Sequence, residues 1–180
     1  KWDSVIPFDL MWEQLNRVIK PNGAIVLFGS EPFSSALRMS NIKAYKYDWT
    51  WIKTKGVGFL KAKKMPLKKS EIICVFYRKS CNYYPQGLTI SDLKNKCITK
   101  NMQTFRTTKQ DHSQKVTYKD YPNNLLYFLN DKGLHPTQKP VALMEYLIKT
   151  YTNPLETVLD FTMGSGSTGV AAVNTGRRFI

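Results

Sequence analysis

Acidic side chains and cysteine are both scarce in this sequence. Asp and Glu together number 13 against 27 Lys and Arg, and the three cysteines form no C-x-x-C pair. The cysteine pattern argues against both a disulfide framework and a zinc site, so no metal is expected. No apolar run approaches the roughly 18 residues of a membrane helix, and no signal peptide is recognisable. These absences predict a soluble, intracellular globular protein that has no membrane partner.

Positive charge is what the sequence has in excess. The formal net charge is +14 and the sequence pI is about 9.7. Such a balance is typical of nucleic-acid-binding domains, because clustered Lys and Arg neutralise phosphates, although net charge can also serve solubility alone. With 42% hydrophobic residues over 180 positions, the chain is long enough for the core of about one domain.

The apolar pattern alternates between helical and strand-like segments. Residues 7–20 repeat apolar side chains at helical spacing, and residues 24–28 form a short continuous apolar run. Such a run is typical of a strand that is buried on both faces in a parallel sheet. Further helices are predicted over 33–41, 140–151 and 168–174, and further strands over 45–52, 72–77, 157–161 and 178–180. This order predicts an α/β fold.

Residues 53–69 form a strongly basic stretch. They contain seven lysines and no acid, with two glycines among them, so we predict a basic loop or hairpin arm. The side chains expected to neutralise nucleic-acid phosphates are Lys61, Lys63, Lys64, Lys68 and Lys69. The alternative is a charged arm that is only solvated.

A glycine-rich turn, residues 162–167, joins a predicted strand to a predicted helix. This arrangement presents free backbone N–H groups and the positive end of a helix dipole to a ligand. Gly164, Gly166 and Gly169 satisfy the G-x-G-x-x-G pattern, which by itself also fits a nicotinamide-dependent oxidoreductase or a plain turn without a ligand. A nicotinamide-binding domain normally begins with this unit, whereas here the turn lies near the end of the sequence. Leu155, just before the strand, occupies a position where a turn glycine would be natural.

Two motifs in a fixed order carry a family resemblance. Residues 135–140 are His-Pro-Thr-Gln-Lys-Pro, and residues 160–168 are Asp-Phe-Thr-Met-Gly-Ser-Gly-Ser-Thr. Together they resemble the β-class, permuted DNA methyltransferases that act on adenine N6 or cytosine N4. The resemblance extends to residues 12–33, 51–53 and 72–79. It implies a Rossmann-like methyltransferase sheet with helices on both faces and a circularly permuted motif order.

The resemblance also implies a division of the chain. Residues 1–79 would form the catalytic-side half with the basic arm, and residues 134–180 the half that binds S-adenosylmethionine. Residues 80–133, which are polar, turn-rich and without a sustained period, would be an inserted target-recognition region.

In that family the two motifs together bind S-adenosylmethionine. The cofactor-binding residues that the resemblance implies are Thr137, Gln138, Lys139, Asp160, Phe161, Thr162, Met163, Gly164, Ser165, Gly166, Ser167 and Thr168. Asp160 would hold the ammonium group at the amino-acid end of S-adenosylmethionine, the methyl donor. The alternative is that Asp160 only caps the end of the strand. For Thr137 and Lys139 the alternative is an ordinary helix entry.

The reaction implied is methyl transfer to an exocyclic base amine in double-stranded DNA after base flipping, with adenine N6 favoured over cytosine N4. A cytoplasmic bacterial or phage-encoded enzyme of a restriction-modification system is expected, and a homodimer is compatible with the resemblance. Two alternatives stay open: the nicotinamide-dependent oxidoreductase and a non-catalytic DNA-binding module.

The family's catalytic loop is absent from these residues. That loop is Asp, Asn or Ser followed by Pro-Pro and an aromatic residue, yet none of the nine prolines here is adjacent to another. We expect the loop upstream of Lys1, and we assign no catalytic residue within the sequence.

Overall fold

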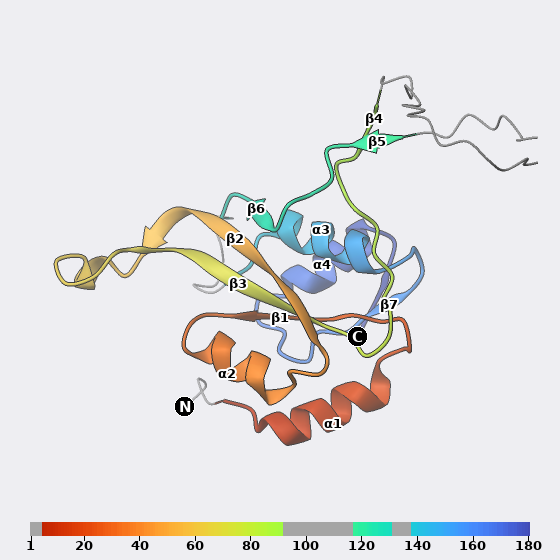
Figure 1. Ribbon diagram of the computed structural model, residues 1–180, viewed down its shortest axis with the longest axis horizontal. Coiled ribbons are helices and arrows are strands. Elements are labelled where there is room, and N and C mark those ends of the chain that lie inside the picture. The colour runs from red at the N-terminus through yellow and green to blue at the C-terminus, as the bar shows by residue number, and fades with distance from the viewer. Residues whose placement is uncertain (1–4, 92–116, 131–137) are drawn as a thin grey trace, which may run out of the picture. The chain divides into compact units, whose positions relative to one another are not determined.

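The computed structural model describes residues 5–91, 117–130 and 138–180 (Figure 1). Two compact units are present: residues 1–84 with 123–180, and residues 85–122. In the smaller unit, β4 (Thr89–Ile90) pairs antiparallel with β5 (Tyr118–Lys119), and the Thr89 hydroxyl donates to the Asp120 carboxylate. The role of residues 80–133 in target recognition stays a prediction.

The larger unit contains a four-stranded sheet in the order β1-β3-β2-β6. Both β1 (Ile25–Gly29) and β2 (Tyr45–Val57) run antiparallel to β3 (Lys68–Phe76), and β6 (Leu125–Tyr127) runs parallel to β2. The predicted strand at 24–28 is therefore present, and the one pairing that the structure describes for it, with β3, is antiparallel and not the parallel pairing that the run favours. Its continuous apolar run reports burial from both faces, which says nothing about the direction of the neighbouring strand.

Helices cover both faces of this sheet. On one face lie α1 (Phe8–Val18) and α2 (Phe33–Ser40), whose side chains pack against the sheet in a cluster with Cys74 and Phe76. The buried residues of that cluster are Trp12, Leu15, Leu37, Ala44, Cys74 and Phe76. The predicted α/β architecture with helices on both faces is confirmed.

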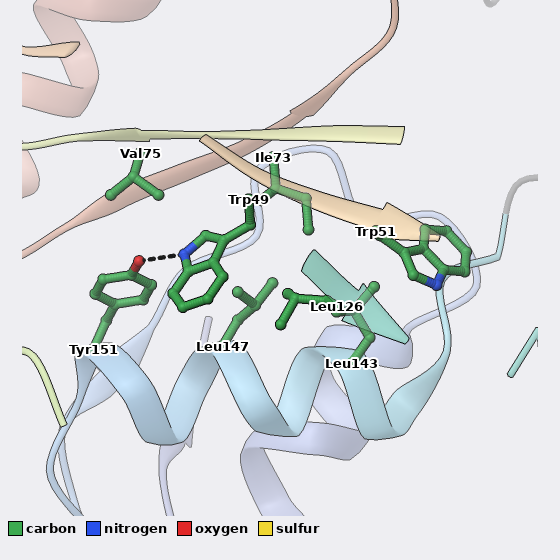
Figure 2. Close-up of a cluster of buried hydrophobic side chains, with 8 residues drawn as sticks. All are labelled: Trp49, Trp51, Ile73, Val75, Leu126, Leu143, Leu147 and Tyr151. Carbon is green, nitrogen blue, oxygen red and sulfur yellow. Dashed lines mark hydrogen bonds between the residues drawn. The ribbon is translucent and has the colours of Figure 1, made fainter. Parts of the chain in front are cut away.

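The opposite face packs against α3 (Val141–Tyr151) (Figure 2). The buried residues there are Trp49, Trp51, Ile73, Val75, Leu126, Leu143, Leu147 and Tyr151. Ile73 and Val75 belong to this cluster while Cys74 belongs to the other, as the two-residue period of a strand requires. The Trp49 indole N–H donates to the Tyr151 hydroxyl at 2.6 Å, so the polar atoms of these buried rings are paired.

The end of the chain forms a βαβ unit. Two short parallel strands, β7 (Thr157–Val158) and β8 (Arg178–Phe179), are joined through α4 (Ser167–Asn174). The helix packs on α3 through a cluster of Ile148, Ala171 and Ala172, so α3 connects this unit to the larger sheet. Among the strands that the structure describes, β1 pairs only with β3 and β7 only with β8. Each therefore has one edge that no described strand covers.

A 3₁₀ turn, η1 (Phe59–Lys61), lies between β2 and β3 at the end of the hairpin that extends from the sheet (Figure 1). The basic arm, residues 53–69, is therefore a hairpin arm as predicted. None of the helices in the described ranges is long and apolar enough to cross a membrane.

Candidate functional site

The glycine-rich turn at the start of α4 is open to solvent. Residues 161–165 are exposed, and a Cβ added to Gly164 or Gly166 would meet no atom within 4 Å. Gly166, the residue before the helix, has φ +80°, a left-handed conformation that favours glycine. The first N–H groups of α4 have no helical acceptors, so this turn presents main-chain donors to an accessible space.

Asp160 connects the two ends of this turn. Its Oδ1 accepts from the Thr162 backbone N–H at 3.1 Å, and its Oδ2 accepts from the Thr168 hydroxyl at 2.6 Å. These bonds are what the strand-end cap alternative predicts. Because an ionised carboxylate has about four acceptor sites, Asp160 keeps capacity for a further donor.

A cavity of about 950 Å³ lies beside the turn. Its wall includes β1 and β7, the residues just before α3, and the first residues of α4. The residues predicted to bind a cofactor that line it are Gln138, Lys139, Asp160, Phe161, Thr162, Gly164, Ser165, Ser167 and Thr168. A largely apolar cavity of this size with a few convergent polar groups is typical of a small-molecule site.

Two of the predicted cofactor residues do not line the cavity, and the structure does not describe a third. Met163 and Gly166 belong to the turn but are not part of the cavity wall, and Thr137 lies outside the described residues. The structure also adds Phe28 and Phe33, on either side of the β1–α2 connection. Phe28 lies one residue before the end of the apolar strand β1, and residues at strand ends often meet at one ligand-binding edge of an α/β sheet. This position is the signal that could have identified it.

Lys139 is held by a carboxylate at the border of the cavity. Glu71, on β3, lies 2.9 Å from the Lys139 ammonium and 2.7 Å from that of Lys53. Burial opposes ionisation of Glu71, but the attraction of Lys139 and Lys53 outweighs it and lowers the Glu71 pKa. The Lys139 ammonium also lies 5.2 Å from the centre of the Phe28 ring. Two lysines share one carboxylate, so the cluster has a net positive charge.

The five lysines predicted to contact phosphates are all exposed on the basic arm. They are Lys61, Lys63, Lys64, Lys68 and Lys69. None of the five forms an ion pair with another described residue. Their charges are therefore available to an anionic partner. The arm and the cavity are two separate features of the larger unit.

The family model N6_N4_Mtase, a DNA methylase family, matches residues 8–180. The chain belongs to this DNA methylase family. The resemblance seen in the two motifs is therefore confirmed, and the nicotinamide-dependent oxidoreductase alternative loses its support.

Two bacterial DNA methyltransferases are similar to this chain over nearly its whole length. It is 30% identical to the type II methyltransferase M2.LlaDCHI of Lactococcus lactis subsp. cremoris, over 99% of this chain and 64% of that protein. It is 24% identical to the DNA adenine methyltransferase YhdJ of Escherichia coli K12, over 99% of this chain and 63% of that protein. The chain thus spans slightly less than two thirds of the length of these relatives.

Solved structures share the fold. The M1.HpyAVI–SAM complex matches with a TM-score of 0.65 and 24% identity, covering 100% of this chain and 77% of the other. The cytosine-N4-specific PvuII DNA methyltransferase matches with a TM-score of 0.62 and 17% identity, covering 96% and 64%. The methylase chain therefore has the Rossmann-like fold that the sequence predicts.

Proposed function

We propose that this chain carries the donor-binding and DNA-contacting part of an S-adenosylmethionine-dependent DNA methyltransferase that modifies an exocyclic base amine. The observation that carries the proposal is the convergence of two motifs on one cavity. Gln138 and Lys139 come from the first motif, and the turn from Asp160 to Thr168 comes from the second. Residues of both motifs line the same cavity of about 950 Å³. Membership of a DNA methylase family supports the assignment.

The residues of the turn fit the donor. S-adenosylmethionine has a carboxylate and an ammonium group at its amino-acid end, and the turn offers exposed main-chain N–H groups together with the Asp160 carboxylate. The open space beside Gly164 lets a ligand approach the backbone closely. Phe28 and Phe33 supply apolar surface in the same cavity, and M1.HpyAVI, a protein of the same fold, was crystallised with this donor.

When bound, the donor supplies a sulfonium methyl group for an in-line displacement, which needs no metal. The exocyclic amine of a base is a poor nucleophile because its lone pair is conjugated with the ring, so the protein's task is chiefly positioning. In this chain, the turn and Asp160 would fix the donor, and the arm lysines would hold the phosphates of a duplex from which the target base is flipped. The Pro-Pro loop of the family, whose groups would orient the amine, does not occur among these 180 residues.

Adenine N6 is the favoured target. The similarity to YhdJ, named a DNA adenine methyltransferase, supports this choice, while the similarity to the cytosine-N4-specific PvuII enzyme at the level of the fold keeps cytosine as the second candidate. Mass spectrometry of nucleosides from duplex DNA treated with the complete enzyme separates N6-methyladenine from N4-methylcytosine. A cytosine product would reverse the assignment.

Calorimetry with a Gly164→Val variant tests the donor site. A Cβ at Gly164 meets no protein atom within 4 Å, so the substitution should leave the fold intact while filling the space that the donor needs. We expect S-adenosylmethionine to bind the unaltered chain and raise its free energy of unfolding by about 2.7 kcal/mol at one hundred times Kd. The variant should lose binding by about tenfold or more, at unchanged stability without donor.

Val173→Leu is the matched control, since Val173 is exposed on α4 and is not part of the cavity wall. Its donor affinity should equal that of the unaltered chain. A titration with NAD completes the test. Binding of NAD without S-adenosylmethionine, or full donor affinity in Gly164→Val, would contradict the proposed site.

A further inference from the structure

The basic arm ends in large apolar side chains that pack against almost nothing. Phe59 is 81% exposed and Leu60 is 100% exposed, and both belong to η1. Further apolar residues of the arm, Val57, Met65 and Leu67, are also exposed. Single exposed apolar side chains are common, but a group of them at the end of a projecting hairpin is typical of an interaction surface.

The backbone of the tip is organised without help from these side chains. Gly58 has φ +95°, and its carbonyl accepts from the Lys61 N–H at 2.9 Å. The Lys61 carbonyl accepts from the N–H groups of Lys64 and Met65 at 2.9 and 3.0 Å. The turn is thus closed by main-chain hydrogen bonds, so Phe59 and Leu60 are presented outward and do not hold the arm together.

Charge complementarity identifies the kind of partner. Residues 53–69 contain seven lysines and no acidic residue. The partner must therefore be polyanionic, and it must also offer an apolar space. A DNA duplex meets both conditions, because phosphates line its backbone and the stacked bases present apolar faces once a step is opened.

We propose that Phe59 and Leu60 are a wedge that enters a base step of the duplex while the arm lysines hold the flanking phosphates. This proposal rests on DNA being the substrate, as given under the proposed function, and adds the residues that deform it. Apolar wedges between base steps partly unstack and kink DNA. A duplex weakened in this way would release the target base more readily, since extrusion must overcome stacking and pairing.

The test compares three variants of the 180-residue chain on a duplex that contains 2-aminopurine, whose fluorescence rises when it unstacks. Phe59→Ala/Leu60→Ala removes the wedge, and Lys63→Ala/Lys64→Ala removes two phosphate contacts. Met39→Ala/Val173→Ala is the matched control, since these residues are 70% and 72% exposed on α2 and α4. All six positions are exposed, so circular dichroism should report unchanged folds.

We expect the unaltered chain to bind the duplex and raise the fluorescence. The wedge variant should bind about tenfold more weakly with the same salt dependence, and the fluorescence rise should be lost. The lysine variant should reduce the slope of log K against log salt by about 2. The control should behave as the unaltered chain.

Two results overturn the wedge: full affinity and fluorescence in the Phe59→Ala/Leu60→Ala variant, or binding to anionic phospholipid vesicles, but not duplex, that depends on these two residues. The first leaves DNA binding by the arm in place and removes only the wedge. Failure of the unaltered chain to bind duplex removes the DNA-contacting part of the proposed function as well, whereas donor binding is judged separately by calorimetry.

Discussion

At the scale of single residues, Glu71 is the side chain whose charge matters most to the region around the cavity. It is 9% exposed and lies between Lys53 and Lys139, which lower its pKa below the ordinary value of 4.5. A folded-state pKa below the unfolded one means that the ionised carboxylate stabilises the fold. This contribution is complete above about pH 4.5 and disappears as the pH falls through the lower folded-state value.

The prediction is that Glu71→Gln lowers the free energy of unfolding at pH 7 by about 1–3 kcal/mol, because two lysines then lose the partner that offsets their burial. The difference from the unaltered chain should shrink as the pH falls below about 4.5, because the carboxyl then binds a proton in the unfolded chain before it does so in the fold. Urea unfolding at a series of pH values measures this. The exposed Glu13→Gln serves as the control, and a difference that stays constant down to pH 2.5 would contradict the argument.

Leu155 and Asp160 illustrate how much a single residue reveals before its neighbours are known. Leu155 occupies a turn position where a glycine would be natural, and it adopts φ +67°, with its N–H donating to the Gly176 carbonyl at 2.8 Å. The local turn chemistry is visible in the sequence. The hydrogen bonds of Asp160 to Thr162 and Thr168 are not visible in the sequence, because the turn contains several hydroxyl groups and only the folded turn determines which of them reach the carboxylate.

At the scale of elements, the βαβ unit at the end of the chain was the most predictable part. Its apolar strands and glycine turn are local signals: β7 and β8 lie within the predicted segments, and α4 begins one residue before the predicted helix of 168–174. The antiparallel pairing of β1 with β3 was not predictable from the apolar run alone. Nor was β6, since a strand of three residues is too short to display a two-residue period, and only its pairing with β2 and the burial of Leu126 define it.

The same unit provides a prediction about the entry of α4. Thr168 is 7% exposed, and its hydroxyl donates to Asp160 Oδ2 at 2.6 Å, so this bond connects the helix to the strand end. Thr168→Val keeps the shape of the side chain but removes the hydroxyl group that donates this hydrogen bond. We expect a loss of about 1–2 kcal/mol in the free energy of unfolding and a several-fold weaker affinity for S-adenosylmethionine, because the turn loses its fixed conformation. Denaturant unfolding measures the first effect and calorimetry the second. An unchanged affinity for S-adenosylmethionine would mean that the Thr168–Asp160 hydrogen bond does not support the binding site.

At the scale of the larger unit, α3 is the connection between its two sheets. Leu143, Leu147 and Tyr151 belong to the cluster on the four-stranded sheet, whereas Ile148 belongs to the cluster with Ala171 and Ala172 of α4. The cavity lies along the same junction, since both β1 and β7 contribute to its wall. The region between the two sheets therefore holds both a small apolar cluster and the proposed donor site. S-adenosylmethionine bound there would contact residues of both sheets.

Ile148→Ala should uncouple the two parts. The substitution removes buried apolar volume beside α4 and should cost about 2–5 kcal/mol. The three described tryptophans, Trp12, Trp49 and Trp51, all lie in the clusters on the four-stranded sheet, so their share of the fluorescence reports on that sheet and the helices packed against it. In the variant, far-UV circular dichroism should begin to fall at a lower urea concentration than tryptophan fluorescence changes, because the βαβ unit unfolds first. Saturating S-adenosylmethionine should bring the two curves together again by stabilising the side that carries the turn. The exposed Val173→Ala should show coincident curves throughout, and coincident curves in Ile148→Ala would mean that the two sheets unfold as one cooperative body without this contact.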